Sequence, residues 1–463
     1  MSDFDASSAG LTPRPHSRAP RGAWRRGRTA LLHLVYDGSF LLLLVLGLPW
    51  FALRFATSRR FRRGLPQRLG FVPVRQSRKP CIWIHGVSVG EVKAAGALAR
   101  GLRERFPSYE IVFSATTQTG FELARELYRE SLLFYYPLDA FWIVSRVFRR
   151  IRPSWIVLVE LEIWPNLLLR ADRAGVPVMV VNGRISERSW RGYRRLRRFL
   201  PEFTRIRHTC AQNETYRERF LDIGVPADRV SVTGNVKFDN LRARGDLAPN
   251  ADLRRLFGIE ERECVFVAGS THPGEERAAL AAARAVRASG RPIRLIIAPR
   301  HPPRLPEVLA ELRDHGGEPV RLTELRSGNA QASPTATYVV DTIGELERVY
   351  SLAAVVFVGG SLFPKGGHNV LEPAALGKPV LFGPHTFNFD AETALLLERR
   401  AARRIGDDAE LSRALLELLD DPEEAKRMGQ AAIAAIEENR GATARTIAAL
   451  EPILRENAAN SLR

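Results

Sequence analysis

Residues 85–91 read HGVSVGE and place a carboxylate, Glu91, between an apolar run typical of a buried strand and an alanine-rich run typical of a helix. Ser88 and Glu91 have the S-x-x-E spacing of a capping box, in which each side chain satisfies a backbone donor where a helix begins. A carboxylate held at a strand end can also take a proton as a general base. The spacing allows both interpretations, a helix cap and a base.

Two other segments place charged side chains after apolar runs. In VELEIWPN, Glu160 and Glu162 lie two residues apart, so along a strand both carboxylates point to the same side. Two carboxylates on one face of a strand destabilise the fold unless they are solvated or interact with a ligand, which favours a functional role. In TGNVKFD, Lys237 lies near the expected domain boundary, where its ammonium group either reaches a ligand or is a solvated hinge residue.

The densest stretch runs from residue 358 to 389 and contains Gly366, Gly367, His368, Asn369 and Glu372. The glycines allow backbone amides to approach a ligand, and a helix predicted to begin at Asn369 would offer its positive end to a phosphate. Asn369 and Glu372 repeat the capping-box spacing. Glu372 has a second interpretation, because acidic side chains often accept hydrogen bonds from ribose hydroxyls. Long loops of this composition are usually functional.

Two shorter motifs suit an anionic ligand. In APRHP, Arg300 directly follows a predicted strand, where a guanidinium group can hold a phosphate through two parallel bonds; a surface salt bridge is the alternative. DTIGEL, residues 341–346, reads as a strand-to-helix turn with exposed amides that could meet a nucleotide, and a simple helix start explains it nearly as well.

The formal net charge of +18 suggests an anionic partner. Arginines cluster on both sides of the apolar segment 30–53. As a helix this segment is long enough to cross the roughly 30 Å hydrocarbon core of a bilayer, although Asp37 and Pro49 interrupt it. We expect a basic, disordered tail over 1–29 and an uncleaved membrane-anchor helix over 30–56, held by anionic lipid. The three cysteines lie far apart, which argues against disulfides or structural zinc and favours a cytosolic setting for the rest of the chain.

Short apolar runs alternate with helical patterns from residue 79 onward, and the series restarts after a polar stretch over 239–263. Near-continuous apolar runs are typical of parallel strands covered on both faces. The pattern predicts an α/β protein with two doubly wound, Rossmann-like domains facing a cleft, over residues 57–243 and 244–463, the second ending in terminal helices. Ligands of such sheets bind beyond the carboxyl ends of the strands.

Several signatures are missing from the sequence. No G-x-x-x-x-G-K-[ST] motif is present, and no acidic pair of D-x-D type follows a strand, so we expect no P-loop, no catalytic metal and no cofactor. The basic run 191–199 favours a face toward membrane or lipid phosphate. Because the arginines are not interleaved with stacking aromatic residues, nucleic acid is not an expected partner.

These motifs resemble the 3-deoxy-D-manno-octulosonic acid (Kdo) transferases of lipid A assembly. The resemblance covers about residues 30–452 and rests on ordered motifs: HGVSVGE, ELEIWPN, AQN, TGNVKFD, GSTHPGEE, PRHP, DTIGEL and GGSLFPKGGHNVLEPAALGKPVLFGPHTFNF. It implies a GT-B fold, an N-terminal acceptor domain and a C-terminal domain that binds CMP-Kdo. It also implies that the enzyme transfers Kdo at the cytoplasmic face of the inner membrane, to a tetraacylated, bis-phosphorylated lipid A precursor.

The resemblance also implies residue roles. Glu91 matches the general base, and Glu160 and Lys237 match positions that stabilise the transition state. The positions that match the nucleotide contacts are Pro299, Arg300, Gly344, Glu345, Leu346, Asn369, Val370, Leu371 and Glu372. Candidate donor or acceptor loop residues are Ser88, Gly90, Ser270, His272, Gly366, Gly367 and His368. The alternatives are a membrane-associated GT-B enzyme that uses another nucleotide sugar, and a basic scaffold without catalysis.

Overall fold

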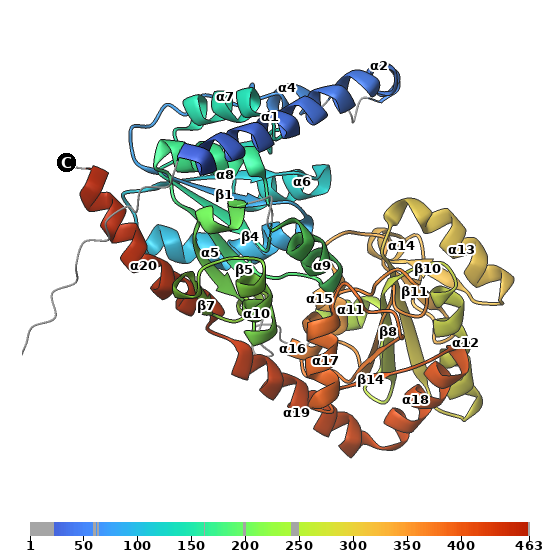
Figure 1. Ribbon diagram of the computed structural model, residues 1–463. Helices are drawn as coiled ribbons and strands as arrows, with labels where there is room; N and C mark the ends of the chain where they lie inside the picture. Colours follow the sequence, from blue (N-terminus) through green and yellow to red (C-terminus); the bar gives the residue numbers. More distant parts are fainter. Residues whose placement is uncertain are drawn as a thin grey trace, which may run out of the picture. The chain divides into compact units, whose positions relative to one another are not determined.

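A computed structural model describes residues 23–58, 62, 64–161, 163–197, 201–241 and 250–461. The chain forms two compact units (Figure 1). The first unit comprises Met1–Val89, Ser108–Thr209 and Thr215–Val230, and the second comprises Gly90–Pro107, Cys210–Glu214 and Ser231–Arg463. Residues 1–22 of the predicted tail and residues 242–249, which include the predicted boundary at 243/244, lie outside the described residues, so those domain boundaries stay predictions.

The first sheet has seven strands in the order β3-β2-β1-β4-β5-β6-β7. Its strands are β1 (Cys81–Gly86), β2 (Glu110–Ala115), β3 (Leu133–Tyr135), β4 (Trp155–Val159), β5 (Val178–Gly183), β6 (Ile206–Ala211) and β7 (Val230–Val232). β1 pairs in parallel with both β2 and β4, and every residue of β1 is buried. The chain order therefore reverses between β1 and β4, as in a doubly wound sheet.

Helices alternate with these strands. They are α4 (Leu65–Arg68), α5 (Val89–Arg105), α6 (Gln118–Leu127), α7 (Phe141–Ile151), α8 (Pro165–Ala174), α9 (Glu187–Leu196) and α10 (Glu214–Asp222). α7 buries Ile143, Val144, Val147, Phe148 and Ile151, the three- and four-residue spacing of an amphipathic helix. α8 has proline at its start and ends on Gly175 at φ +68°, a backbone conformation that glycine adopts without steric cost.

The predicted single anchor helix is two helices in the structure, α1 (Ala23–Leu46) and α2 (Leu48–Thr57). The break at Gly47 has a local cause, since Pro49 in the first turn of α2 has no amide hydrogen to continue the preceding helix. Among the described residues no single helix is both long enough and apolar enough to cross a membrane. Residues 34–46 and 48–57 reach that length and hydropathy only when taken together, with a bend of 56° between them.

The second sheet also has seven strands, in the order β10-β11-β9-β8-β12-β13-β14, and all of its pairs are parallel. Its strands are β8 (Cys264–Thr271), β9 (Ile293–Pro299), β10 (Pro319–Arg321), β11 (Thr337–Val339), β12 (Val355–Val358), β13 (Val380–Phe382) and β14 (Ala402–Arg404). The prediction of two doubly wound parallel sheets is therefore confirmed.

The helices of this unit are α11 (Ala251–Leu256), α12 (Glu275–Ala288), α13 (Leu305–Asp314), α14 (Leu322–Ser327), α15 (Leu346–Tyr350), α16 (Leu371–Ala375), α17 (Asp390–Glu398), α18 (Asp408–Asp420), α19 (Pro422–Asn439) and α20 (Ala442–Ser461). α16 was predicted to begin at Asn369, but it begins at Leu371 and has only five residues. The cause is local, since the Asn369 Oδ1 accepts the Leu371 amide across a turn before the helix.

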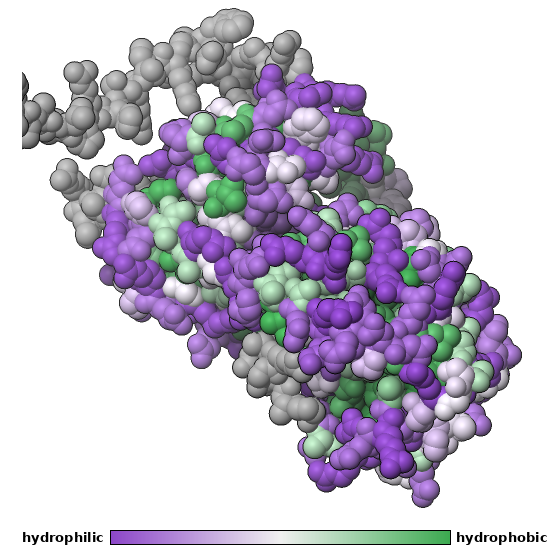
Figure 2. All heavy atoms as spheres, turned by 90° about the horizontal axis from the view of Figure 1, so that it is seen from below, coloured by the Kyte–Doolittle hydropathy of each residue, from purple (hydrophilic) through white to green (hydrophobic). Residues whose placement is uncertain are grey.

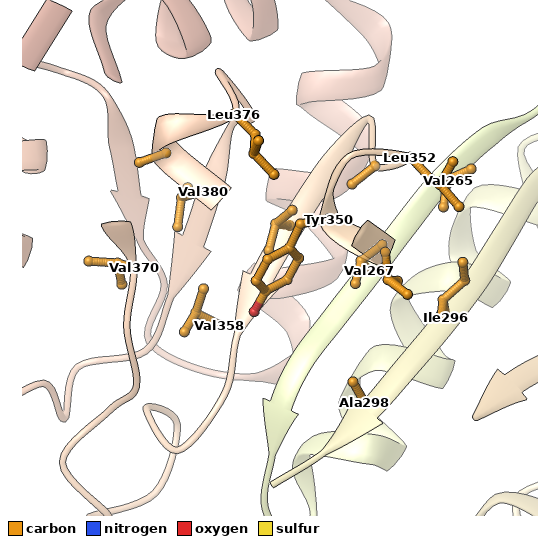
Figure 3. Close-up of a cluster of buried hydrophobic side chains, with 14 of the residues drawn as sticks. Val265, Val267, Ile296, Ala298, Tyr350, Leu352, Val358, Val370, Leu376 and Val380 are labelled. Atoms are coloured by element: carbon orange, nitrogen blue, oxygen red, sulfur yellow. The ribbon is translucent and has the colours of Figure 1, made fainter. Parts of the chain in front are cut away.

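Both faces of the second sheet are covered by apolar side chains. Val265 and Val267 belong to one core cluster, whereas Phe266 and Ala268 on the same strand belong to another, because successive side chains of a strand point to opposite faces. Figure 3 shows the first cluster, in which Tyr350 packs among aliphatic residues of β8, β9, β12 and β13. Continuous apolar strands are therefore buried on both sides, as the sequence predicted.

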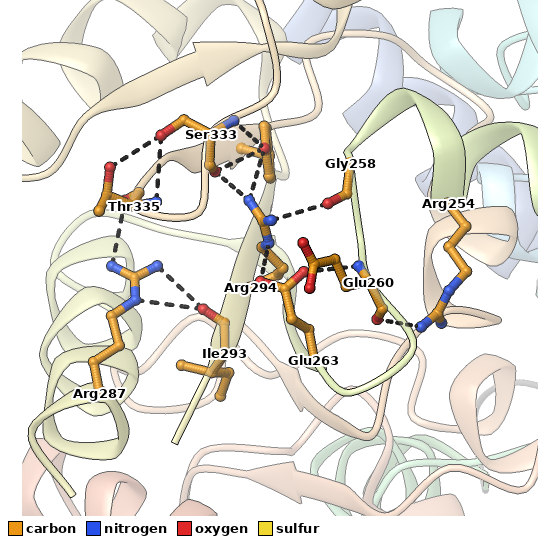
Figure 4. Close-up of polar contacts among 10 residues, drawn as sticks. Arg254, Gly258, Glu260, Glu263, Arg287, Ile293, Arg294, Ser333 and Thr335 are labelled. Carbon is orange, nitrogen blue, oxygen red and sulfur yellow. Dashed lines mark hydrogen bonds and ion pairs between the residues drawn. The ribbon is translucent and has the colours of Figure 1, made fainter. Parts of the chain in front are cut away.

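A charged side chain inside this unit is fully engaged. Arg294 on β9 is 3% exposed and pairs through Nε with Glu263 at 2.8 Å. Its other nitrogens donate to the Gly258 carbonyl at 2.9 Å and to the Ser333 carbonyl (Figure 4). This cluster joins β9 to the segments before β8 and before β11 at the end of the sheet opposite to the strands' carboxyl ends.

Candidate active site

Three neighbouring strands of the second sheet, β9, β8 and β12, deliver polar loops to one edge. Because these strands are parallel, the loops that follow them emerge on the same side. β8 runs into His272, β9 into Arg300, and β12 into the glycine-rich stretch that starts at Gly359. The Arg300 amide donates to the Thr271 carbonyl at 3.0 Å, which fixes the first two loops together.

Glu275 holds two of these loops in place. It lies in the first turn of α12, is fully buried, and accepts four backbone amides. Its Oε2 accepts from His272 at 2.9 Å and Gly360 at 2.7 Å, and its Oε1 accepts from Ser361 at 2.9 Å and Leu362 at 3.0 Å. Burial raises the pKa of this carboxyl, and the amide hydrogen bonds oppose that shift. Glu275 is therefore a fixed brace under the loops rather than a group facing a ligand.

Three histidines gather above this brace. The Nε2 atoms of His272 and His368 lie 2.9 Å apart in nearly parallel rings, and the His301 ring meets His272 edge-on at 5.3 Å. One nitrogen of the close pair must carry the proton and the other must accept it. Burial, followed by nearby positive groups including Arg300, lowers the pKa of His272 to about 4 and that of His368 to about 3.

The close histidine pair is therefore neutral at pH 7 and lies in a positive environment that suits an anion. Within the described part of the chain, no group of three or more His, Cys, Asp or Glu side chains is arranged to hold a metal ion.

Glycines make the close approach of these loops possible. Gly360 has φ +69°, and a Cβ there would lie 2.8 Å from the His368 ring. Gly366 has φ +95°, and a Cβ there would collide with the Asn388 side chain. Gly367, at φ +73°, donates its amide to the Gly360 carbonyl at 2.7 Å. The glycine-rich loop is thus folded back on itself, and it presents His368 to His272.

The predicted residues 369–372 adjoin this cluster. The Asn369 Nδ2 donates to Glu372 Oε1 at 3.1 Å, so the two polar side chains are bonded to each other. Burial raises the pKa of Glu372, and among the smaller contributions Arg300 lowers it, which places the guanidinium group in its electrostatic range. Val370 and Leu371 are buried in the core, so any ligand contact from these two residues would come from their backbone.

The other predicted nucleotide loop lies between β11 and α15. Gly344 has φ +91°, and the Glu345 carboxylate pairs with Arg326 at 2.8 Å and Arg348 at 3.1 Å. Leu346 begins α15, and the side chain of Ile343 is 89% exposed. Because the Glu345 side chain is already engaged, the groups left to a ligand here are the backbone of the turn and an exposed apolar side chain.

Lys237 lies just before a short 3₁₀ turn and faces α17. Its Nζ is 3.7 Å from Glu392 Oε1, and the Asn235 Nδ2 donates to the same oxygen at 3.2 Å. Glu392 is 3% exposed, and Lys237 also lies over the Phe389 ring at 5.9 Å. The ammonium group is thus held at a defined place by a buried carboxylate.

Glu160 directly follows β4 with φ +65°, a left-handed conformation that is uncommon for a residue other than glycine. Its amide donates to the Val181 carbonyl at 2.9 Å, so the strained residue is fixed by the neighbouring strand. Such strain costs about 1–3 kcal/mol and occurs preferentially at functional sites. Glu162, the second acid of the motif, lies outside the described residues.

Glu91 lies in the first turn of α5 and is 9% exposed. The helix begins at Val89, so Ser88 occupies the position before the helix, as a capping box requires, and Gly90 is exposed. The carboxylate therefore lies in the first turn of the helix that follows β1 in the chain, a position that both interpretations of the motif share.

Two functional candidates were missed from the sequence. Glu275 is part of GSTHPGEE, but no local pattern indicates that its carboxylate accepts loop amides, the first of them that of Gly360, 85 residues later. Glu392 lies 155 positions after Lys237, its partner. The sequence feature that could have identified Glu392 is its place in a predicted helix directly after the long glycine-rich loop.

Known proteins are similar to this chain in sequence and in fold. A family model described as 3-Deoxy-D-manno-octulosonic-acid transferase (kdotransferase) matches residues 63–240. The chain is 34% identical to the 3-deoxy-D-manno-octulosonic acid transferase of Haemophilus influenzae, over 86% of this chain and 93% of that protein. It is also 34% identical to the enzyme of that name from Bordetella pertussis, over 85% of this chain and 94% of that protein.

Among solved structures, a glycosyltransferase from Rickettsia africae aligns with a TM-score of 0.54 and 12% identity, over 83% of this chain and all of that one. At this identity the likeness shows the fold alone, two α/β domains as predicted for a GT-B enzyme. The sequence relatives show more, because they are over 30% identical along nearly their whole length. The chain belongs to the 3-deoxy-D-manno-octulosonic acid transferase family and is a glycosyltransferase.

Proposed function

We propose that this enzyme transfers Kdo from CMP-Kdo to a hydroxyl group of the tetraacylated, bis-phosphorylated disaccharide precursor of lipid A. Kdo transfer is what the family does; the donor, the acceptor and the residue roles are the proposal. The observation that carries it is the edge of the second sheet where the neutral His272–His368 pair lies in the positive field of Arg300. A nucleoside monophosphate sugar with a carboxylate is an anion suited to such an edge.

In the proposed reaction, the carboxylate of Glu91 takes the proton of the acceptor hydroxyl group while the oxygen of that hydroxyl group bonds to the anomeric carbon of Kdo. The bond from that carbon to the phosphate oxygen breaks, and CMP leaves as an anion. Arg300 and the loop amides stabilise this charge, and Glu160 and Lys237 stabilise the transition state. The base and the leaving group account for both the proton and the electron pair, and no metal ion takes part.

The nucleotide is proposed to lie along the turn at Gly344 and Glu345, against Pro299 and beside Glu372. Here Ile343 supplies an exposed apolar surface for the base, and Glu372 accepts hydrogen bonds from the ribose hydroxyls. Ser270, at φ +57° just before His272, and the paired glycines near His368 would shape the pocket for the sugar.

The membrane partner is proposed to be the anionic cytoplasmic leaflet of the inner membrane. The exposed large apolar side chains on α1 and α2 are Leu34, Val35, Leu41, Leu42, Leu43, Val45, Leu46, Leu48, Trp50, Leu53 and Phe55. We call them the anchor surface. Arg54 lies over the Trp50 ring at 5.6 Å and Arg62 lies over Phe55 at 5.9 Å, so cations border it.

Elsewhere, on the face shown in Figure 2, hydrophilic side chains predominate. A bent helix pair with an apolar face and arginines at its border suits a position in the plane of the lipid headgroups. The anchor surface is therefore proposed to lie on the membrane, with the rest of the chain in the cytoplasm.

Activity measurements with a matched control test this proposal. Purified enzyme in detergent micelles is given the lipid acceptor and either CMP-Kdo or a UDP-sugar, and release of the free nucleotide is followed. Glu91→Gln keeps the spacing of a capping box but cannot accept a proton, so turnover should fall by about 100-fold or more in a folded protein. Glu104→Gln, an exposed change on the same helix, should retain wild-type turnover.

Two outcomes would contradict the proposal. Turnover with a UDP-sugar and none with CMP-Kdo would favour another glycosyl transfer. Wild-type turnover by Glu91→Gln would show that Glu91 serves only as a helix cap and not as the general base.

A further inference from the structure

A polar cluster in the first unit joins the anchor helix to the loop that carries Glu160. The cluster consists of Tyr36 and Asp37 on α1, Asp139 before α7, and Asn166 in the first turn of α8. Asp37 was noticeable in the sequence only as a charge that interrupts an apolar segment. In the structure its Oδ1 accepts the Asn166 Nδ2 at 2.8 Å and the Phe141 amide at 3.3 Å.

Asn166 is fully buried and is held from two sides. Its Nδ2 donates to the Asp139 carbonyl at 2.6 Å as well as to Asp37, and its backbone amide donates to Asp139 Oδ2 at 2.9 Å. Asp139 Oδ1 accepts the Leu167 amide at 2.9 Å. Asp139 therefore caps α8, and Asp37 caps α7, helices whose own preceding residues provide no side-chain cap.

The remaining contact of the cluster comes from Tyr36, the residue before Asp37 on α1. The Tyr36 hydroxyl donates to Asp139 Oδ2 at 3.3 Å. Along α1 and α2 the partly buried positions are Tyr36, Asp37, Phe40, Leu44, Gly47 and Phe51, and no residue there is fully buried among those described with side chains. This is one narrow stripe at helical spacing. Apolar contacts along such a stripe permit sliding and rotation, whereas the two bonds of Asp37 select one register.

The register of α1 matters because of what lies next to Asn166. The loop from Glu160 to Trp164 spans only the interval between β4 and α8. Its first residue is fixed to β5 through the Val181 carbonyl, and its far end is fixed through Asn166. A shift of α1 removes one of the acceptors that hold that far end.

We propose that Asp37 is a positioning residue, through which the docked anchor helix holds the Glu160 loop in its active conformation. The anchor helix then does more than tether the enzyme, because acceptor transfer needs it seated on the first unit. This inference rests on the proposed function in one respect, namely that the Glu160 loop serves the lipid acceptor. It adds that a membrane-facing helix and an acceptor loop share one hydrogen-bonded cluster.

The test uses the full-length chain in detergent micelles, where a tether to the membrane is not required. Asp37→Leu removes the acceptor of both bonds, whereas Asp37→Asn keeps an oxygen for Asn166 and for the Phe141 amide. Ser39→Leu is the matched control, because Ser39 is exposed and its hydroxyl bonds only within α1, to the Val35 carbonyl. Three quantities are measured: hydrogen exchange of the amides over 163–168, kcat/KM for the lipid acceptor, and binding to anionic phosphatidylglycerol vesicles.

Asp37→Leu should speed amide exchange over 163–168 and lower kcat/KM for the acceptor by about ten-fold or more, the size expected for loss of a hydrogen bond to a charged group. Vesicle binding should be retained, since the anchor surface is unchanged. Asp37→Asn should restore most of both properties, and Ser39→Leu should match the wild type.

Wild-type exchange and wild-type kcat/KM in Asp37→Leu would overturn the inference and leave α1 a tether. Loss of vesicle binding with normal kcat/KM in micelles would overturn it as well. If the wild-type protein transfers no Kdo, the proposed function fails instead, and the exchange measurement alone then decides whether Asp37 holds the end of the loop.

Discussion

Replacing Glu275 by glutamine should loosen the loops of the candidate active site by a calculable amount. The carboxylate accepts four buried amides, two on each oxygen. Glutamine keeps one oxygen and presents an NH₂ group to the other two donors, which then have no acceptor. Each buried amide left unpaired costs about 1–3 kcal/mol, so Glu275→Gln should lower the free energy of unfolding by about 2–6 kcal/mol.

The sequence supplies an internal control for the assay. All seven tryptophans lie at or before residue 190, and those at 50, 83, 142, 155, 164 and 190 fall in the first unit. Fluorescence during urea unfolding therefore reports the first unit, while far-ultraviolet circular dichroism reports both. Glu275→Gln should shift the second-unit transition to lower urea and leave the fluorescence transition in place, and it should speed exchange of the amides of residues 360–362.

Glu276→Gln is the matched comparison. Glu276 is equally buried, but its Oε1 alone accepts the Thr271 hydroxyl at 3.0 Å and Arg304 at 3.2 Å, so a glutamine oxygen keeps both hydrogen bonds. The charge of Arg304 stays paired with a second carboxylate, Glu307 at 3.5 Å. Its loss of stability should be smaller than that of Glu275→Gln. Equal losses in the two variants, or unchanged exchange at residues 360–362 in Glu275→Gln, would refute the assignment of Glu275 as the brace.

Further variants probe other parts of the structure. Arg294→Ala removes the positive partner of the largely buried Glu263 carboxylate, which keeps the Glu260 amide, and should cost the second unit about 3 kcal/mol, measured by circular dichroism in urea. Burial lowers the pKa of His85 to about 3, so between pH 7 and 5 only the unfolded chain binds a proton there, and this residue should lower the free energy of unfolding by about 2 kcal/mol over that range. His85→Gln should lose that contribution and show a pH dependence shallower by the same amount. Replacing the exposed Arg188 and Arg195 of α9 by glutamine should raise KM for a bis-phosphorylated acceptor several-fold and leave KM for CMP-Kdo unchanged.

The strands that carry the site could be predicted, whereas two edge strands could not. β8, β9 and β12 are apolar runs long enough to be recognised, and the polar residues after them were found by position alone. β10 and β14 have three residues each, reading PVR and ARR, and lie at the two ends of the sheet. Short, charged edge strands are common, because charge and brevity there prevent pairing with other chains.

Contacts between residues far apart in the chain could not be predicted from the sequence either. Asp37 was interpreted as an interruption of the anchor and Glu275 as one residue of a motif, yet each carboxylate is explained by amides far away in the chain. A sequence pattern with a period of two or 3.6 residues reports local geometry and cannot report which distant donor a buried acid meets. The same limit applies to His85, the first residue of the HGVSVGE motif, which is a buried core residue whose Nδ1 is hydrogen-bonded to the Ser114 hydroxyl.

Mass analysis of the lipid product tests the central claim most directly. The wild-type protein is incubated with CMP-Kdo and the tetraacylated, bis-phosphorylated disaccharide, without added metal and with a chelator present. The acceptor should gain the mass of one or more Kdo residues, and free CMP should appear in step with it. An unmodified acceptor, under conditions in which a characterised Kdo transferase modifies it, would rule out the proposed transfer.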